Sequence, residues 1–325
     1  MRLLRKALRF AGFLLLGALV VAGPGRNAAA EDAFRVGTPE PRAFNFGMLN
    51  AGEELGIFKK YALTIQRIDL GGGAKLHQAM VAGAIDVALG GGTDLQFLAK
   101  GSPEKAVAQM ASSPSNMAIV VKADSPIKTV ADLKGKKIGA STVGSLTSWI
   151  ALETARQQGW KPDDITLVYL GNFNGLLAGL TSGAIDAMSG NLEISYVIQD
   201  EGKYRILLRG GDLVHDFVSS IIYASDTTIA QKPEQLRRFL AAWFETIQYM
   251  HDHEDQAVQI MAKLLDTTPA VTKNIYAAEM PSFSLDGRFN RKDLAIVEKT
   301  LLNFHSIDAI PADSAVLDER FLPKK

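Results

Sequence analysis

Ala82-Gly83-Ala84-Ile85-Asp86 and Ser182-Gly183-Ala184-Ile185-Asp186 are two stretches that stand 100 residues apart and share Gly-Ala-Ile-Asp. Each follows an apolar helix face and leads into a short strand that ends in glycine, at Gly90 and Gly190. A glycine at a helix end takes the left-handed conformation that the turn into the next strand needs. Because the local context is the same on both sides, the repeat predicts two lobes of like architecture.

Around both stretches, short apolar strands alternate with amphipathic helices. The predicted strands are Phe34–Thr38, Leu63–Ile68, Ile85–Leu89, Lys105–Met110, Lys137–Ala140, Thr166–Leu170, Ile185–Met188 and Tyr204–Leu208. The predicted helices between them are Phe44–Leu55, Ala74–Val81, Asp94–Lys100, Ser145–Gln158, Gly175–Thr181 and Leu192–Gln199. This alternation predicts an α/β fold with largely parallel sheets.

The domain organisation follows from two extended stretches, Met117–Lys122 and Ser219–Ala224, which we interpret as the strands that cross between the lobes. Residues 31–119 and 221–325 are predicted to form a discontinuous first lobe, and residues 120–220 the second. After residue 225 the pattern becomes mostly helical. The predicted helices are Pro233–His251, Glu254–Leu265, Pro269–Met280 and Arg291–Phe304, which we expect to pack on the first lobe.

The first 30 residues have the pattern of a secretory signal. A basic head precedes the apolar run Phe10–Ala22, and the small residues Ala28–Ala30 come just before Glu31. The apolar run is about 13 residues long, too short to cross a bilayer core of about 30 Å. We therefore predict a signal peptide at residues 1–30 and a mature chain that is soluble in the periplasm.

The charge and the cysteine content of the chain exclude some classes of partner and of chemistry. The chain has 35 basic and 35 acidic residues, and the predicted signal holds five of the basic ones, which leaves 30 against 35 and a net charge of −5. A mildly acidic surface argues against nucleic acid as a partner. The sequence has no cysteine, which excludes a thiol nucleophile and a Cys-ligated metal site, and also a lipid anchor on cysteine.

An ordered set of motifs resembles the periplasmic binding proteins of the sulfonate, nitrate and taurine importer group, within the thiamine-pyrimidine-binding-like superfamily. The matching segments are Gly56–Leu63, Gly71–Gly73, Ala79–Asp86, Ser125–Ile138 and Ala140–Ser145. The resemblance implies a two-lobed type II periplasmic-binding-protein fold with two hinge crossovers and a ligand cleft between the lobes. It also implies an ABC permease and its ATPase as partners.

The sequence departs from this family's pattern at a few positions. Ile57 stands at an aromatic position, Ala62 replaces a glycine, and Asn191-Leu192-Glu193 stands where the family often has Trp-x-Pro. The last departure leaves a sulfonate or nitrate specificity unsupported.

Candidate ligand-binding residues lie in loops at the carboxyl ends of strands, where open α/β sheets bind ligands. Seven loops are expected to meet there: Thr38–Phe44, Gly71–Gly73, Gly90–Asp94, Ala111–Asn116, Ser141–Ser145, Gly171–Asn174 and Gly190–Glu193. In the loop Ser141–Ser145, the candidates Ser141, Thr142, Gly144 and Ser145 precede a helix whose first N–H groups attract anionic oxygens, although Ser145 or Thr142 can equally cap that helix.

Gly92, Thr93 and Asp94 form a second candidate loop, in which glycines let a ligand approach the backbone and Asp94 can instead cap the next helix. The remaining candidates carry opposite signals and leave the charge of the ligand open. They are Arg42 as a counter-charge for an anion, Phe44 for stacking, Asn172 and Asn191 for hydrogen bonds, and Glu193, together with Glu40, for an amine or hydroxyl-rich ligand.

The sequence has no pattern that indicates a metal site or a phosphate-binding loop. His251-Asp252-His253 lies at a predicted helix end, where the helix dipole favours a histidine cation, so we predict no metal site there. The glycines Gly71–Gly73 lack the Gly-Lys-Ser/Thr of a phosphate loop. We predict no catalytic residues and no cofactor.

These observations predict a monomeric solute-binding component of an ABC importer that captures a small organic molecule, such as a sulfonate, a carboxylate or a related polar metabolite, by hinge closure. A ligand sensor that reports to a membrane receptor is one alternative. An enzyme is another, because thiamine-pyrimidine synthases share the fold that the resemblance implies. Those relatives carry a cysteine-rich iron motif, which this chain lacks.

Overall fold

The computed structural model describes residues 33–324. The predicted signal at residues 1–30 lies outside the described residues. Within them, no helix is both long and apolar enough to cross a membrane.

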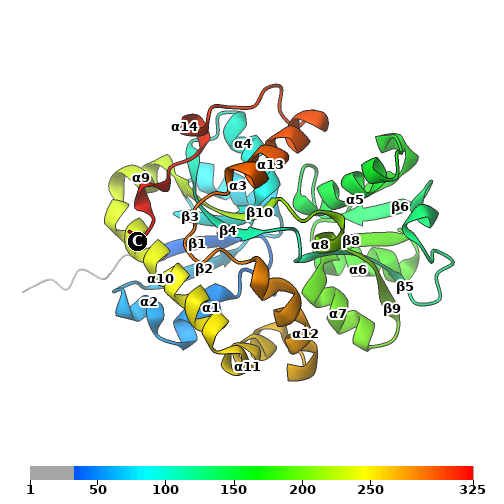
Figure 1. Cartoon of the computed structure of the whole chain (residues 1–325), viewed down its shortest axis with the longest axis horizontal. Coiled ribbons are helices and arrows are strands. Elements are labelled where there is room, and N and C mark those ends of the chain that lie inside the picture. The colour runs from blue at the N-terminus through cyan, green and yellow to red at the C-terminus, as the bar shows by residue number, and fades with distance from the viewer. Residues whose placement is uncertain (1–32, 325) are drawn as a thin grey trace, which may run out of the picture. The chain divides into compact units, whose positions relative to one another are not determined.

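The described residues contain two five-stranded sheets, flanked by helices (Figure 1). The first has the order β2-β1-β3-β10-β4, and its strands are β1 (Phe34–Thr38), β2 (Ile65–Asp69), β3 (Val87–Gly91), β4 (Glu104–Ser112) and β10 (Val218–Ser225). The second has the order β7-β6-β8-β5-β9, with β5 (Met117–Lys122), β6 (Lys137–Ala140), β7 (Thr166–Tyr169), β8 (Ala187–Asn191) and β9 (Tyr204–Arg209). The predicted α/β fold is confirmed.

The sheets are mixed, and the expectation of largely parallel sheets is wrong for one strand in each. β10 pairs antiparallel with β3 and β4, and β5 pairs antiparallel with β8 and β9, whereas the β1 and β6 pairings are parallel. β5 and β10 each follow a strand of the other sheet. Their neighbours within the sheet are instead reached through a helix, and β5 and β10 run antiparallel to them. The extended stretches are therefore members of the sheets, and the crossings themselves are residues 113–116 and 210–217.

The repeated Gly-Ala-Ile-Asp stretches occupy equivalent places. Gly83 and Gly183 have φ of 69° and 80°, the left-handed conformation that the pattern predicted. Asp86 accepts a hydrogen bond from the Arg35 backbone N–H at 2.9 Å, and Asp186 accepts one from Lys137 N–H at 2.8 Å. Each carboxylate thus fastens its turn to the first residues of the neighbouring parallel strand.

The isoleucines of the two stretches also pack alike. The Ile85 side chain lies against Gly37 of β1, and the Ile185 side chain lies against Gly139 of β6. A Cβ added at Gly37 would lie 2.5 Å from Ile85 Cδ1, and one at Gly139 would overlap Ile185 Cδ1. A glycine in β1 and another in β6 therefore make room for the isoleucine that packs between helix and sheet.

Helices lie against both sheets (Figure 1). Before β10 they are α1 (Met48–Glu54), α2 (Ile57–Lys60), α3 (Gly73–Val81), α4 (Leu95–Ala99), α5 (Leu146–Gln157), α6 (Phe173–Ser182), α7 (Leu192–Asp200) and α8 (Gly210–Leu213). The C-terminal part adds α9 (Asp226–Gln231), α10 (Pro233–Asp252), α11 (Glu254–Leu265), α12 (Pro269–Glu279), α13 (Arg291–Asn303) and α14 (Asp313–Val316).

The C-terminal helices pack largely beside the first sheet. The apolar face of α10 is fully buried and shares a core with β1 and α1, in which Phe239 lies 5.2 Å from Phe34 between ring centroids. Isolated bridges join Leu317 and Phe283 to β4. α12 in addition contacts α7, which lies beside the second sheet. The residue limits of the two lobes stay a prediction.

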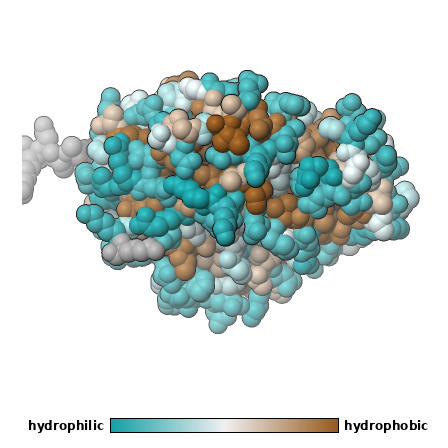
Figure 2. Space-filling view, turned by 45° about the horizontal axis from the view of Figure 1, so that its top comes forward, coloured by the Kyte–Doolittle hydropathy of each residue, from teal (hydrophilic) through white to brown (hydrophobic). Residues whose placement is uncertain are grey.

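The surface is mostly hydrophilic, with hydrophobic side chains gathered in the middle of the face that Figure 2 shows. The large apolar side chains that the described residues expose are Val81, Val143, Tyr169, Leu285 and Ile310. Most other large apolar side chains are buried in the cores.

Candidate functional site

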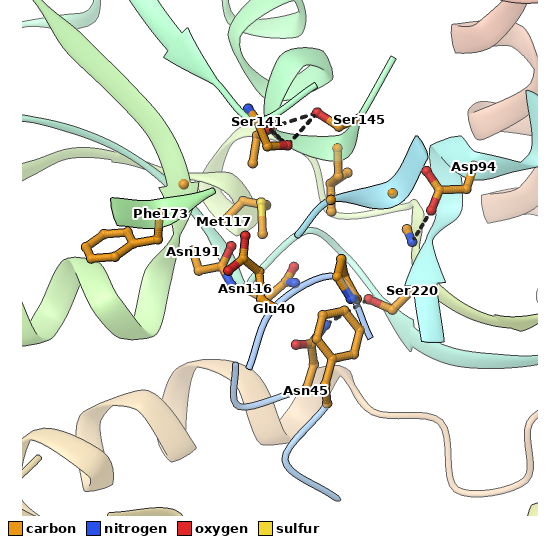
Figure 3. Close-up of a pocket in the computed structure, with 18 of the residues that line it drawn as sticks. Glu40, Asn45, Asp94, Asn116, Met117, Ser141, Ser145, Phe173, Asn191 and Ser220 are labelled. Carbon is orange, nitrogen blue, oxygen red and sulfur yellow. Dashed lines mark hydrogen bonds between the residues drawn. The ribbon is translucent and has the colours of Figure 1, made fainter. Parts of the chain in front are cut away.

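A cavity of about 70 Å³ lies between the two sheets, large enough for several water molecules or one small polar group. We call it the inner cavity (Figure 3). It is lined by Pro39, Glu40, Asn45, Phe46, Gly72, Gly73, Gly91, Asp94, Asn116, Met117, Ser141, Ser145, Leu146, Thr147, Phe173, Leu176, Gly190, Asn191 and Ser220. Each of the seven loops that the strand pattern singled out contributes at least one of these residues.

A hydroxyl cluster at the start of α5 forms one wall of the inner cavity. Ser145 is the N-cap of α5 and accepts the Ser148 backbone N–H at 3.3 Å. Ser141 Oγ donates to Ser145 Oγ at 3.1 Å and lies 2.9 Å from Thr147 Oγ1. Ser145 therefore caps the helix, as one alternative held, and Ser141 and Ser145 also face the cavity (Figure 3).

Opposite this wall, Asp94 belongs to a buried charged triad. Its Oδ2 accepts the Gly91 backbone N–H at 2.9 Å and lies 3.2 Å from His77 Nε2, while His77 Nδ1 lies 2.9 Å from both Glu104 oxygens. Burial alone would lower the pKa of His77, but its contacts with the carboxylates of Asp94 and Glu104 outweigh burial and raise that pKa to about 9. His77 is therefore a cation that compensates much of the buried negative charge.

Glu40 reaches the middle of the inner cavity, beside Asn116 and Asn191 (Figure 3). Burial raises the pKa of Glu40 to about 7, and the negative charges of Glu193 and Asp69 add to the effect. No ion pair joins the Glu40 carboxylate to a cation anywhere in residues 33–324. A carboxylate in this position can be neutralised by a proton or by a ligand.

A second carboxyl pair spans the two sides. Glu193 on α7 and Glu279 on α12 are both buried and interact with each other, and a proton on one of them would let the pair form a hydrogen bond. Burial raises the pKa of both groups, and their mutual repulsion raises that of Glu279 further. Glu193 Oε1 also accepts the Phe44 backbone N–H at 3.1 Å and the Asn191 amide at 3.2 Å.

A further hydrogen bond crosses between the two sides. The Gln96 side chain on α4 donates to the Gly144 carbonyl oxygen at 2.7 Å. Together with the bond from Phe44 to Glu193, it joins the first sheet's loops to the second sheet's loops. The two sides therefore touch on both flanks of the inner cavity.

A wider space of about 840 Å³, which we call the outer groove, adjoins the inner cavity through Glu40 and Phe173. It is lined by Glu40, Pro41, Arg42, Asp69, Leu70, Gly71, Lys75, Asn172, Phe173, Asn174, Leu177, Glu193, Ile194, Val197, Ile198, Glu201, Leu265 and Asp266. Arg42 here forms an exposed ion pair with Asp266 at 3.4 Å. Asn172 caps α6 by accepting the Gly175 N–H at 3.1 Å.

The structure thus divides the predicted site residues. Asp94, Ser141, Ser145 and Asn191 line the inner cavity, whereas Arg42, Asn172 and Glu193 line the outer groove. Their role in ligand binding stays a prediction.

Five predicted residues lie apart from both spaces. Phe44 is fully buried in an aromatic cluster with Tyr276 and Phe283, so it packs in the core. Gly92 is needed for close packing, because a Cβ there would overlap the Val218 carbonyl oxygen. Thr93 and Gly144 border a different surface pocket near Gln96, and Thr142 packs towards Gly72.

Sequence reasoning missed several polar lining residues, among them Asn45, Asn116 and Ser220. These three are buried, and Asn45 donates to Ser220 Oγ at 3.2 Å. The carbonyl oxygens of the Asn45 and Asn116 side chains have no hydrogen-bond partner. Asn116 ends a loop that was predicted to reach the cleft, but Ser220 lies within an apolar strand, where no sequence signal marks it.

His251 and His253, at the end of α10, contact residues close to them along the chain. His251 Nδ1 lies 3.2 Å from Asp252 Oδ1, and His253 stacks on Tyr249 at 4.1 Å between ring centroids. No group of three or more His, Cys, Asp or Glu side chains between residues 33 and 324 has the arrangement of a metal site.

Comparison with known proteins places this fold. The alkanesulfonate-binding protein SsuA of Xanthomonas axonopodis pv. citri, solved bound to MOPS, superposes with a TM-score of 0.74 at 22% identity and covers 89% of this chain and 99% of its own. The desulfurization enzyme DSZB superposes with a TM-score of 0.63 at 18% identity over 89% of this chain and 97% of its own. The chain therefore has the two-sheet fold of solved periplasmic binding proteins, a fold that the enzyme DSZB shares.

The sequence comparison adds the family. The profile of a family described as NMT1/THI5 like matches residues 43–257, which is well over half of the chain. A protein of Escherichia coli (strain K12) that is named for binding aliphatic sulfonates is 27% identical over 269 residues, which make up 79% of this chain and 78% of that protein. The chain belongs to the NMT1/THI5-like family, and the resemblance seen in its motifs is confirmed.

Proposed function

We propose that this protein is the periplasmic solute-binding component of an ABC importer and captures a small organic ligand between two lobes by hinge closure. The inner cavity carries the proposal, because loops of both sheets line it. A ligand held there touches both sides at once. It binds the closed arrangement better than an open one and shifts the population towards it.

The hydrogen bonds that flank the cavity fit this mechanism. The bonds from Gln96 to Gly144 and from Phe44 to Glu193 join the two sides directly, without a ligand. Each net hydrogen bond contributes about 0.5–1.5 kcal/mol, so two of them give the closed arrangement only modest stability of its own. A ligand that adds contacts to both sides then decides the balance.

The relatives support a binding role. The Escherichia coli relative is named for binding aliphatic sulfonates, and the SsuA structure holds MOPS. DSZB shows that the same fold also serves an enzyme. We propose a non-enzymatic role here, because the chain has no cysteine and therefore no thiol nucleophile.

The proposed partners are a membrane permease and its ATPase, and the proposed route to them is secretion. If residues 1–30 are a signal, the mature protein begins at or near Glu31 and is released by osmotic shock. The intact mass of the released form measures this directly. A chain that keeps Met1 and sediments with the membranes would contradict it.

The binding role is tested with the mature protein by thermal unfolding against a panel of sulfonates including MOPS, carboxylates, amines, aromatic acids and pyrimidines. A ligand present at 100 times its Kd stabilises the native state by about 2.7 kcal/mol, which raises the unfolding midpoint by several degrees. Small-angle scattering with the same compound should then show a smaller radius of gyration. Unchanged unfolding with every class, together with no small molecule released from the purified protein on denaturation, would contradict the proposal.

A further inference from the structure

The inner cavity has acidic side chains and no basic one. Its lining residues include the carboxyl groups of Glu40 and Asp94, and no lysine or arginine is among them. An anion would therefore meet only hydroxyls, amides and the first N–H groups of α5 on one wall, and two carboxyl groups elsewhere.

The two carboxyl groups differ in what compensates them. Asp94 shares the protonated His77 with Glu104, so a cation already lies 3.2 Å from its Oδ2. Glu40 has no such partner. Arg67 donates to its backbone carbonyl oxygen at 2.9 Å, no ion pair reaches its carboxylate within residues 33–324, and Glu193 and Asp69 add negative charge beside it. The unmet negative charge of the cavity is therefore at Glu40.

Two buried amide oxygens beside the same cavity also lack donors. The side chains of Asn45 and Asn116 are only 2% and 7% exposed, and their Oδ1 atoms have no hydrogen-bond partner. Leaving a buried acceptor unsatisfied costs about 1–3 kcal/mol. Both amides line the space into which Glu40 projects, so the cavity presents acceptors that require N–H or O–H donors (Figure 3).

The outer groove likewise has more acidic than basic side chains. The outer groove contains five acidic side chains, Glu40, Asp69, Glu193, Glu201 and Asp266, and two basic ones, Arg42 and Lys75. Asp266 is paired with Arg42, Asp69 with Arg67 and Glu201 with Lys203, so the carboxyl groups of the groove that have no ion pair within the described part of the chain are those of Glu40 and Glu193. A groove with an excess of negative charge raises the local concentration of cationic ligands.

From these observations we infer that the inner cavity selects ligands with a cationic, donor-rich nitrogen group, such as an ammonium or amidinium, and that Glu40 is the residue that receives it. Asn45 and Asn116 accept the remaining N–H bonds. The inference rests on the proposed function and names the ligand class for that same site. A simple sulfonate or carboxylate without such a group is not the preferred ligand.

The first experiment compares cations and anions that share a carbon skeleton. Benzylamine, benzamidine and propylamine are measured against benzoate, benzenesulfonate and propane-1-sulfonate by thermal unfolding and titration calorimetry of the mature protein at pH 7. We expect the cations to raise the unfolding midpoint and the matched anions to leave it unchanged. In parallel, any small molecule that the purified protein releases on denaturation is analysed by mass spectrometry in both ion modes for a basic nitrogen.

The second experiment measures protons. A cation beside Glu40 favours the ionised carboxylate, so binding at pH 7 should release protons, whereas an anion in the same place should take them up. Calorimetry in buffers of different ionisation enthalpy gives the sign. Glu40→Gln should abolish the release and weaken cation binding about ten- to a hundredfold, because a charge-assisted hydrogen bond is lost. Glu40→Asp, which keeps the charge, should retain part of the affinity.

Glu234→Gln is the matched control, since Glu234 lies in the first turn of α10 with a side chain that is 81% exposed. It should bind like the unaltered protein. Binding of the anions alone, or cation binding that Glu40→Gln does not weaken, would overturn the inference and leave the binding role intact. If no compound binds and no small molecule is released, the proposed function itself is overturned and the inference with it.

Discussion

His77 is a residue whose chemistry only the fold reveals. In the sequence it stands alone, but the structure places it between Asp94 and Glu104, with the Tyr223 ring edge-on at 5.0 Å between centroids. His77 lies on a helix, Asp94 in a short turn and Glu104 on a strand. Because they are distant along the chain, no spacing rule could find the triad.

The raised pKa of His77 predicts a pH dependence. The folded state binds the proton more tightly than the unfolded chain, so its contribution is fully present below the ordinary pKa of about 6.5 and is lost as pH rises through about 9. At about 1.36 kcal/mol for each pKa unit, roughly 3 kcal/mol of stability disappears over this range. Urea unfolding at pH 6 and pH 9.5 measures it.

His77→Gln is the variant for this prediction. It keeps a hydrogen-bonding side chain but leaves the Asp94 and Glu104 carboxylates without their cation. It should be less stable than the unaltered protein at pH 6, and the difference should shrink by pH 9.5. A difference that is the same at both pH values would show that His77 is neutral.

At the scale of the element, the start of α5 combines capping with a wall of the cavity. Ser145 belongs to the cap, whereas Ser141 lines the cavity from the end of β6. Thr142, its neighbour, has a buried hydroxyl without a hydrogen-bond partner and does not line the cavity. The sequence indicated the loop but could not separate these roles, since all three residues are small and hydroxylated.

This division predicts different effects for neighbouring variants. Ser141→Ala should weaken binding of a verified ligand up to about tenfold, because one hydrogen bond to it is worth about 0.5–1.5 kcal/mol. Thr142→Ala, the control, should change affinity little and should not lower stability through a lost bond. Calorimetric affinity and the unfolding midpoint of both variants test this. Equal affinity for Ser141→Ala and the unaltered protein would limit Ser141 to supporting the cap.

At the scale of the whole molecule, we expect Glu193 and Glu279 to join the two sides through a shared proton. Glu40 also faces Glu193, so a rise in pH adds negative charge to a region that already holds it. The pKa values of Glu193 and Glu279 in the folded state are both above the ordinary 4.5. The stability that these two groups contribute is therefore present at low pH and is lost as pH rises through those values.

Glu279→Gln should remove this dependence, because the amide supplies the donor without a titrating proton. We expect the variant to be at least about 1 kcal/mol more stable than the unaltered protein at pH 8.5, and the advantage to vanish towards pH 5. Urea unfolding at both values measures the difference, and small-angle scattering shows whether the unaltered protein expands as pH rises. A constant stability difference would contradict the shared proton.

The repeat, the alternating elements and the C-terminal helices were predictable because glycine caps, apolar periods and proline starts are local signals. The predicted Glu254–Leu265, for example, is α11 as the structure has it. The directions of β5 and β10 and the pairing of Glu193 with Glu279 were not predictable, because they depend on partners far along the chain. The loops that line the cavity were predictable, but which of their side chains face it depends on how the two sheets meet.

The position of β10 has a consequence for the order of folding. All strands of the second sheet come from residues 117–209, whereas the first sheet has β10 inserted between β3 and β4. The second sheet therefore closes shorter loops and should form first. Pulse-labelled hydrogen exchange during refolding should show backbone protection in β6 and β8 before β3 and β4. The reverse order would contradict this.

A chain synthesised from its N-terminus would then carry β3 and β4 for more than a hundred residues without the strand that separates them. Unpaired strand edges are templates for aggregation. The same insertion that binds the two halves of the mature molecule together thus leaves the nascent one exposed, and the interval between residues 112 and 218 is the period during which it needs protection.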